Sequence, residues 1–446
     1  MKRACDVPGT PTYFFYNLGC PKNLVDAEVA AARLEDAGWR RSRDPRDADL
    51  LVVTTCAFIT AAEEESIEQV LEVAAAKDEA QLLAVVGCLV SREGRRLERL
   101  LPEVDIFLDV ASMDRLPEAA GEISGRPPVF GPGGAGRRAL FTPSHIAYLK
   151  IAEGCSNRCS YCTIPSIRGP LTSRPQAGIA VEAGALAAAG VRELVLVAQD
   201  TTSWRRDHGE DGALYPLMDT LSAIEGIEWI RLMYLHPARV DPGRLAAAIR
   251  RTKLLPYLDI PIQHVSDRVL GRMGRGYRGA AIERLVGELR SAVDGLVLRT
   301  TVMTGFPGET EDDFRTLVDF IERSRIDHVG IFRWSPERGT PAARLRGRPS
   351  EETTRRRLEE LSSLQIDLAE ELLAGMRGRS MEVMIDRLVG PDESPAEGFR
   401  AEGRWYGQAP DIDGVTWVRG TAPGPGVRVV ARVEGSEALD LFAVTG

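Results

Sequence analysis

The first part of the chain alternates short apolar runs with stretches of helical periodicity. The runs at 13–18, 50–54 and 82–86 are typical of buried strands. After the first two runs, apolar residues recur every three or four positions, as in an amphipathic helix. This order of strand and helix predicts an N-terminal parallel α/β sheet domain over residues 11–125.

A longer version of the same pattern follows. Apolar runs near Ala147, Leu194, Ile230, Tyr257, Val297 and Val329 recur at intervals of 27 to 47 residues, with amphipathic stretches between them. Regular alternation of this kind predicts a parallel barrel, and about six units predict one that is open on one side. Residues 351–374 form the last predicted helix, so the barrel domain is expected over 145–375.

Two further regions have different patterns. Residues 126–144 are rich in Gly and Pro and are expected to be a linker. Residues 376–446 contain short alternating runs separated by Gly, Pro and Asp, which predict a small all-β barrel. The predicted fold is therefore α/β, with an N-terminal parallel sheet, an open (βα)6 barrel and a C-terminal β barrel.

Composition narrows the class of protein. The chain has 446 residues, 44% of them apolar, and a formal net charge of -9, which describes a globular protein of two or three domains. This acidic net charge disfavours a protein whose main function is to bind the phosphate backbone of a nucleic acid. Since there is no signal peptide or long apolar stretch, we expect a cytoplasmic protein without a membrane partner.

Three cysteines lie on one short loop, at Cys155, Cys159 and Cys162. Three soft thiolates suit an iron-sulfur cluster, and three ligands on a four-iron cluster leave one iron open. A zinc site would need a fourth ligand, and His145 and His208 do not lie at zinc-finger spacing. Disulfides are disfavoured in a reducing compartment. The spacing resembles that of radical S-adenosylmethionine enzymes, in which this cofactor chelates the open iron.

Three more cysteines, Cys20, Cys56 and Cys88, each follow one of the first three apolar runs. The carboxyl ends of parallel strands share one edge of a sheet, so these thiols can converge there. The alternative is three buried structural cysteines. Because the chain also contains the triplet at 155–162, which has the spacing of cluster ligands, we favour a second iron-sulfur cluster at Cys20, Cys56 and Cys88. The remaining Cys5 lies in a Gly- and Pro-containing tail and is interpreted as a free thiol.

Several longer motifs extend from the first strand into the terminal domain. They are residues 18–26 (LGCPKNLVD), 155–169, 173–175, 199–202 (QDTT), 260–264 (IPIQH), 305–310 (GFPGET) and 409–414 (APDIDG). In combination they closely resemble the radical SAM methylthiotransferases that modify ribosomal protein S-twelve. The resemblance covers essentially the whole chain from Tyr13, and it implies that the terminal barrel is a TRAM domain.

The resemblance implies a specific reaction, the insertion of a methylthio group at the β-carbon of one aspartate of that ribosomal protein. Family members use two 4Fe-4S clusters and S-adenosylmethionine, the latter as methyl donor and as radical source. The β-C–H bond of aspartate is not acidic, so the power to break it must come from the cofactor, and we expect no catalytic side chain. The implied partners are ribosomal protein S-twelve, possibly within the ribosomal subunit, and an electron donor such as flavodoxin or ferredoxin.

Four further residues are candidate cofactor contacts by the same resemblance: Tyr161, Gln199, His236 and Gly305. Each of the last three also has a structural interpretation, as a strand cap, a packed turn residue and a tight-turn glycine. His264 ends another motif, but its spacing indicates no chemistry.

Two other functions stay open at this point. A tRNA methylthiotransferase acting on a modified adenosine beside the anticodon would have the same domains and cysteines. The motifs at 19–23 and 199–202 favour the protein substrate, as does the terminal domain, which from residue 376 has 8 Arg and 11 Asp or Glu and so suits a basic protein. An iron-sulfur scaffold or redox sensor would explain the clusters but not the barrel motifs.

Overall fold

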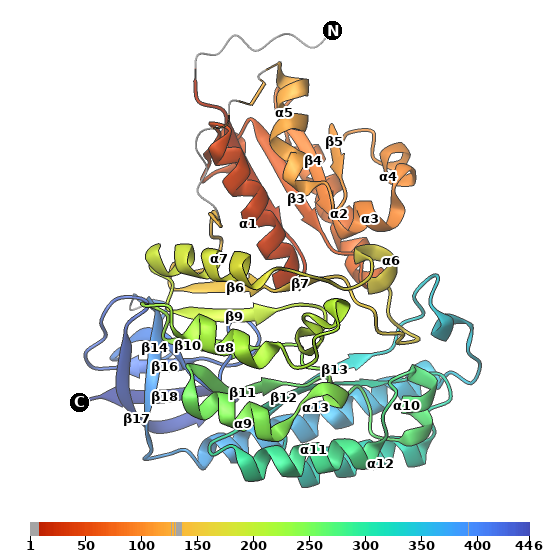
Figure 1. The fold of residues 1–446 in the computed structure, drawn as a ribbon, viewed down its shortest axis with the longest axis vertical. Coiled ribbons are helices and arrows are strands. Elements are labelled where there is room, and N and C mark those ends of the chain that lie inside the picture. The colour runs from red at the N-terminus through yellow and green to blue at the C-terminus, as the bar shows by residue number, and fades with distance from the viewer. Residues whose placement is uncertain (1–8, 126, 129, 131–135, 391) are drawn as a thin grey trace.

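The computed structural model describes residues 9–125, 127–128, 130, 136–390 and 392–446. Figure 1 shows the N-terminal sheet domain above the central barrel and the terminal β barrel beside the central barrel, at the left of the view. Cys5 lies outside the described residues. No helix in the described part of the chain is long and apolar enough to cross a membrane.

The N-terminal domain is built on five parallel strands in the order β2-β1-β3-β4-β5. All residues of β3 and β4 are buried, because helices cover both faces of the sheet. This is a doubly wound order in which ligands bind at the carboxyl ends of the strands. The strands are β1 (Thr12–Asn17), β2 (Arg40–Arg41), β3 (Leu50–Thr55), β4 (Leu82–Gly87) and β5 (Ile106–Leu108).

Helices α1 and α5 pack on one face of this sheet, and α2, α3 and α4 pack on the other. The helical segments are α1 (Pro21–Asp36), α2 (Thr60–Ala76), α3 (Cys88–Glu93), α4 (Arg95–Leu100) and α5 (Leu116–Ser124), with short 3-10 turns η1 (Pro45–Asp47) and η2 (Met113–Arg115). Helix α5 ends at Ser124, and its Leu116 and Ala120 pack into the core.

The central domain is an open barrel of six parallel strands in the order β13-β12-β11-β10-β9-β6, as predicted. Helices alternate with the strands and lie outside the sheet (Figure 1). The strands are β6 (Ile146–Lys150), β9 (Glu193–Val197), β10 (Trp229–Leu232), β11 (Leu254–Asp259), β12 (Val297–Thr304) and β13 (His328–Arg333), and a small ribbon joins β7 (Ala152–Glu153) to β8 (Thr172–Ser173).

The helices of the central domain complete its outer layer. They are α6 (Ile164–Arg168), α7 (Gln176–Ala188), α8 (Leu214–Ser222), α9 (Pro242–Arg251), α10 (Asp267–Met273), α11 (Gly279–Ala292), α12 (Glu311–Ser324) and α13 (Glu351–Ala374), with 3-10 turns η3 (Thr201–Ser203), η4 (Arg206–His208), η5 (Pro237–Arg239) and η6 (Pro341–Arg344). The predicted last helix is thus confirmed as α13, which packs beside β13.

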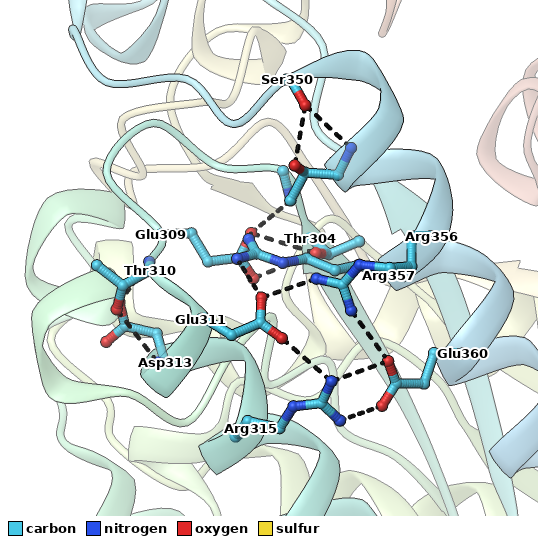
Figure 2. A network of polar contacts seen from close by, with 12 residues as sticks. Thr304, Glu309, Thr310, Glu311, Asp313, Arg315, Ser350, Arg356, Arg357 and Glu360 are labelled. Carbon is cyan, nitrogen blue, oxygen red and sulfur yellow. Dashed lines mark hydrogen bonds and ion pairs between the residues drawn. The ribbon is translucent and has the colours of Figure 1, made fainter.

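The GFPGET motif at 305–310 anchors this last helix. Figure 2 shows Glu309 at the centre of a polar network between the loop after β12 and α13. Its carboxylate accepts hydrogen bonds from the Gly305 backbone N–H at 2.6 Å and from the Arg357 guanidinium at 2.9 Å. His264 also contacts it at 3.3 Å, and the Nδ1 of that ring accepts from two backbone N–H groups. His264 is therefore a buried structural residue with its proton on Nε2.

The terminal domain is a closed five-stranded barrel in the order β14-β15-β16-β18-β17. Its strands are β14 (Ser380–Leu388), β15 (Phe399–Trp405), β16 (Thr416–Arg419), β17 (Arg428–Glu437) and β18 (Asp440–Thr445). The segment 405–413 enters the central barrel at the amino ends of its strands. There Asp413 accepts hydrogen bonds from Tyr257 at 2.7 Å and Arg299 at 2.8 Å, so the APDIDG motif closes the base of the barrel.

Buried ion pairs complete this closure. Arg404 contacts Glu193 at 2.9 Å and Asp386 at 2.8 Å, and Glu193 also accepts from Arg231 at 2.8 Å. Each of these charges has an opposite charge beside it, as a buried ion needs. Asp386 and Asp413 therefore face inward and add nothing to an acidic outer surface of the terminal domain.

The predicted linker is partly outside the described residues, but its last part is well packed. The Arg138 side chain is only 1% exposed and makes ion pairs with Glu28 of α1 and Glu182 of α7. This stretch therefore fastens the N-terminal domain to the barrel.

Candidate functional site

A cavity of about 420 Å³ lies between the carboxyl edge of the N-terminal sheet and the carboxyl ends of the barrel strands. Both predicted cysteine triplets line it, so the fold brings together thiols that are up to 142 positions apart in the chain. The six residues are Cys20, Cys56, Cys88, Cys155, Cys159 and Cys162, and all are free thiols.

Two glycines bring the N-terminal triplet together. Gly19, with φ +95°, precedes Cys20, and a Cβ added to it would lie 3.1 Å from the Cβ of Cys56. Gly87, with φ +103°, precedes Cys88 and approaches the backbone of Thr55 in the same way. Since only glycine combines this backbone conformation with so close an approach, both turns depend on it. The adjacent strands β1, β3 and β4 each present one thiol at the same edge.

Asn23 joins the three cysteine turns. Its side-chain amide donates hydrogen bonds to the backbone oxygens of Leu18 at 3.3 Å and Thr55 at 2.9 Å. Its Oδ1 accepts from the Cys88 thiol at 3.4 Å. The residue is only 3% exposed, so it fixes the relative positions of the turns from within.

The second triplet lies on a loop after β7 that closes on itself. Gly154, with φ +67°, lies so close to Pro170 that an added Cβ would be 2.1 Å from its backbone oxygen. The Cys155 backbone N–H donates to Gly169 at 3.0 Å, which holds the two ends of the loop together. Arg275 donates to the Cys159 sulfur at 3.5 Å. The loop is thus held in place without any ligand.

Arg168 links the two triplets. It ends α6, six positions after Cys162, and its buried guanidinium reaches into the N-terminal domain. There it contacts Asn23, Asp26 at 3.0 Å and, on its own domain, Glu153 at 2.9 Å. The barrel therefore supplies a positive charge beside the N-terminal thiols.

A second contact between the domains lies at the other side of the cavity. Glu337, which follows β13, accepts a hydrogen bond from the Thr60 backbone N–H at 3.0 Å and one from Arg92 at 3.2 Å. Its side chain is 3% exposed. Together with Arg168, this contact holds the N-terminal domain over the mouth of the barrel.

The protonation state of the cavity thiols bears on whether they can bind iron. Burial raises the pKa of Cys88 to about 11 and that of Cys162 to about 12. These thiols stay protonated at neutral pH unless positive charge is placed among them, and iron supplies that charge. Among the described residues, no group of His, Cys, Asp or Glu is spaced to hold a single metal ion. Each ligand of a 4Fe-4S cluster binds a different iron, so three thiols at one place fit the ligand set of such a cluster.

Three of the four predicted cofactor contacts, Tyr161, Gln199 and His236, line the same cavity. Burial, together with the nearby Arg275 charge, lowers the pKa of His236 to about 3. This ring is therefore neutral at physiological pH and can only exchange hydrogen bonds. The fourth, Gly305, is not among the cavity-lining residues in the described part of the chain, and a Cβ there would lie 2.7 Å from Thr354 of α13.

Sequence reasoning did not single out the charged residues of the cavity. Lys22, Arg168 and Arg275 all line it. Lys22 and Arg168 lie within the quoted motifs, which was the available signal. Their contacts join residues more than a hundred positions apart, as in the pair of Asn23 and Arg168, and no local pattern reports such pairs.

Three family models match consecutive parts of the chain. Residues 12–109 match an uncharacterized protein family, UPF0004, residues 149–321 match the radical SAM superfamily, and residues 378–445 match the TRAM domain. These matches follow the three structural domains in order.

The chain is also similar to curated proteins over nearly its whole length. It is 40% identical over 436 residues to the ribosomal protein uS12 methylthiotransferase RimO of Geobacter sulfurreducens, a match that covers 96% of both chains. The protein of the same name from Moorella thermoacetica is 41% identical over 422 residues, covering 93% of this chain and 95% of that one.

Among solved structures, the fold is similar to the radical S-adenosylmethionine methyltransferase TsrM of Kitasatospora setae. The TM-score is 0.53 at 17% sequence identity, covering 86% of this chain and 80% of that chain. At this identity the likeness concerns the fold alone.

Proposed function

Because the chain belongs to the ribosomal protein uS12 methylthiotransferase family, we propose that it inserts a methylthio group at the β-carbon of an aspartate of uS12 by radical SAM chemistry. The radical SAM family implies S-adenosylmethionine and one 4Fe-4S cluster. The observation that carries the finer proposal is the single cavity in which two cysteine triplets face each other.

Each triplet has an assigned role. Cys155, Cys159 and Cys162 would hold the first cluster, while Cys20, Cys56 and Cys88 would hold a second one. When bound, the first supplies the electron that cleaves S-adenosylmethionine, and the second offers a place for the sulfur atom that is transferred. The short distance between the triplets that one cavity implies supports a reaction in which both take part.

The protein's own side chains would bind the cofactor and surround the cavity. Tyr161, Gln199 and the neutral His236 would contact S-adenosylmethionine, and the contact proposed for Gly305 would be made through its turn. The interdomain contacts of Arg168 and Glu337 hold the two domains together around the cavity, and with substrate bound such an enclosure would limit the side reactions of a radical. A small electron carrier such as flavodoxin or ferredoxin would serve as reductant, and uS12 would bind free or within the ribosomal subunit.

Iron analysis tests the two-cluster assignment. Two clusters correspond to about eight irons per chain after anaerobic reconstitution, and replacing Cys155, Cys159 and Cys162 with Ala should leave about four. Cys56→Ala should still cleave S-adenosylmethionine but form no methylthio product. A triple variant that keeps its full iron would remove the loop from the cluster assignment.

Mass spectrometry tests the substrate. We expect uS12 from cells that carry the gene to contain a methylthio group that is missing when the gene is deleted, with bulk tRNA unchanged. A methylthio group that is lost from tRNA instead would establish the tRNA methylthiotransferase function in place of the proposed one.

A further inference from the structure

Lys22 is a buried cation in the wall of the cysteine cavity. The residue is 7% exposed, and its Nζ lies 3.5 Å from the centre of the Tyr234 ring, which lines the same cavity. Its electrostatic neighbours are Tyr234, which it also contacts by a hydrogen bond, Cys20, Arg168 and the buried carboxyl of Asp259, but no carboxylate in the described part of the chain lies within ion-pair distance of it. A buried charge of this kind is costly unless something pairs with it.

The position of Lys22 is unfavourable in a second way. It lies in the first turn of α1, directly after Pro21, and that turn contains no acidic residue. The N-terminus of a helix carries partial positive charge, so it favours anions and disfavours a lysine. The contact that offsets this cost is the ring of Tyr234, which also lines the cavity, so the lysine is held at the cavity wall and not at a structural ion pair.

Tyr234 adds a strained backbone to this arrangement. It has φ +61°, in the left-handed region that residues other than glycine rarely adopt. Its backbone N–H donates to Asp259 at 3.0 Å, and its carbonyl accepts from the Thr201 N–H at 3.1 Å. These bonds hold the strained residue so that its ring lies beside the Lys22 ammonium. Strain held in this way is typical of binding sites.

The other cations of the cavity have different surroundings. Arg168 is paired with Asp26 and Glu153. Arg275 contacts the sulfur of Cys159 and therefore lies on the side of the barrel triplet. Lys22 follows Cys20 by two positions and lies on the side of the N-terminal triplet. Among the described residues it is thus a cavity cation beside the proposed second cluster that has a ring contact but no carboxylate ion pair.

We propose that Lys22 binds the carboxylate of the target aspartate and so selects aspartate as the residue to be modified. This inference rests on the proposed function. The β-carbon of aspartate is bonded directly to its carboxylate carbon, so holding the carboxylate places the reacting carbon at the cavity wall. A desolvated ammonium gives a strong, charge-assisted hydrogen bond to such a group, whereas the neutral amide of asparagine gains much less.

The test compares uS12 that has aspartate at the modified position with uS12 that has asparagine there. Equilibrium binding to the anaerobically reconstituted holoenzyme is measured for both. We expect the wild type to prefer aspartate by about tenfold to a hundredfold, as for a hydrogen bond to a charged group. Lys22→Met should bind both forms equally, and Lys22→Arg, which keeps the charge, should keep part of the preference.

Arg333→Met is the matched control. Arg333 also lines the cavity and the variant loses the same charge, but the side chain is 51% exposed and paired with Glu351. This variant should keep the preference for aspartate. Iron content and S-adenosylmethionine affinity are measured on every variant, because they report the other roles open to Lys22, as a charge beside the N-terminal cluster or as a cofactor contact.

The outcomes separate the inference from the function it rests on. If Lys22→Met binds uS12 tightly and still prefers aspartate, the inference is wrong while the function stands. A fall in iron or in S-adenosylmethionine affinity, with the preference unchanged, would assign Lys22 to the cluster or the cofactor instead. If the wild type binds tRNA and neither form of uS12, the proposed function fails and the inference fails with it.

Discussion

At the amino ends of the barrel strands, Arg404 lies between the carboxylates of Glu193 and Asp386, whereas at the carboxyl ends Lys22 faces a cavity without a carboxylate partner among the described residues. Both side chains are buried cations. At the base the charges satisfy one another, so they serve the fold. At the cavity, neither Lys22 nor the six thiols have an ion-pair partner among the described residues. That end of the barrel therefore serves the chemistry. Burial alone does not distinguish structural from functional charged residues. What distinguishes them is whether an opposite charge of the same chain lies beside them.

The largest effect on stability should come from breaking the base. Arg404→Met leaves Glu193 and Asp386 buried without their shared partner, and we expect a loss of about 3–5 kcal/mol in the free energy of unfolding. Urea denaturation measures it. Arg419→Met, which removes an exposed pair with Glu434, should cost less than about 1 kcal/mol. Equal losses in the two variants would contradict the distinction.

Acid should act on the contacts beside the cavity. Despite its burial, Glu153 has its pKa lowered from 4.5 to about 2 by the charges of Lys150 and Arg168. A lowered pKa contributes stability that is fully present above 4.5 and is lost as pH falls toward about 2. The contribution is on the order of 3 kcal/mol. Denaturation of the iron-free chain and of Glu153→Gln at several pH values should show a difference that shrinks over this window.

For the polar network around Glu309 in Figure 2 we expect a loss of stability of intermediate size. Glu309→Gln leaves the buried Arg357 guanidinium without its full countercharge, and we expect a loss of about 2 kcal/mol. Glu311→Gln removes an exposed carboxylate of the same network and should cost less than about 1 kcal/mol. Thermal unfolding of both variants checks this, and a larger effect at Glu311 would show that burial is not what sets the cost.

The smallest effect should come from Lys22. Lys22→Met loses no ion pair in the described part of the chain, only the contact with the Tyr234 ring, so the free energy of unfolding should fall by about 1 kcal/mol. The measurement is the same urea denaturation as for Arg404→Met. A loss as large as that of the arginine variant would make Lys22 a structural residue and end the comparison.

Sequence alone predicted the repeating elements and the cysteines. The runs that became β3 and β4 are apolar throughout because both faces of the sheet are covered, and such runs can be recognised locally. Cys20, Cys56 and Cys88 follow strands that proved to be neighbours, so a topological rule was enough to predict that they meet.

What sequence could not predict depends on pairs of distant residues. Nothing near Asp413 indicates that it will bind Tyr257 and Arg299, and the acidic balance of its domain suggested an outward surface instead. The packing of the end of the linker could not be predicted for the same reason, because Arg138 forms its ion pairs with residues of α1 and α7. Charge counts do not distinguish a carboxylate that faces solvent from one that closes a barrel.

The closure of the barrel base also sets an order of events during synthesis. Glu193 and Arg299 leave the ribosome long before Arg404 and Asp413, which pair with them. A nascent chain that has been made only as far as α13 therefore contains all six proposed cluster cysteines but not the residues that close the base of the barrel. Closure of the barrel base waits for the terminal domain, so premature termination after α13 would yield a chain with its apolar barrel core but with Glu193 and Arg299 lacking the partners that the terminal domain supplies.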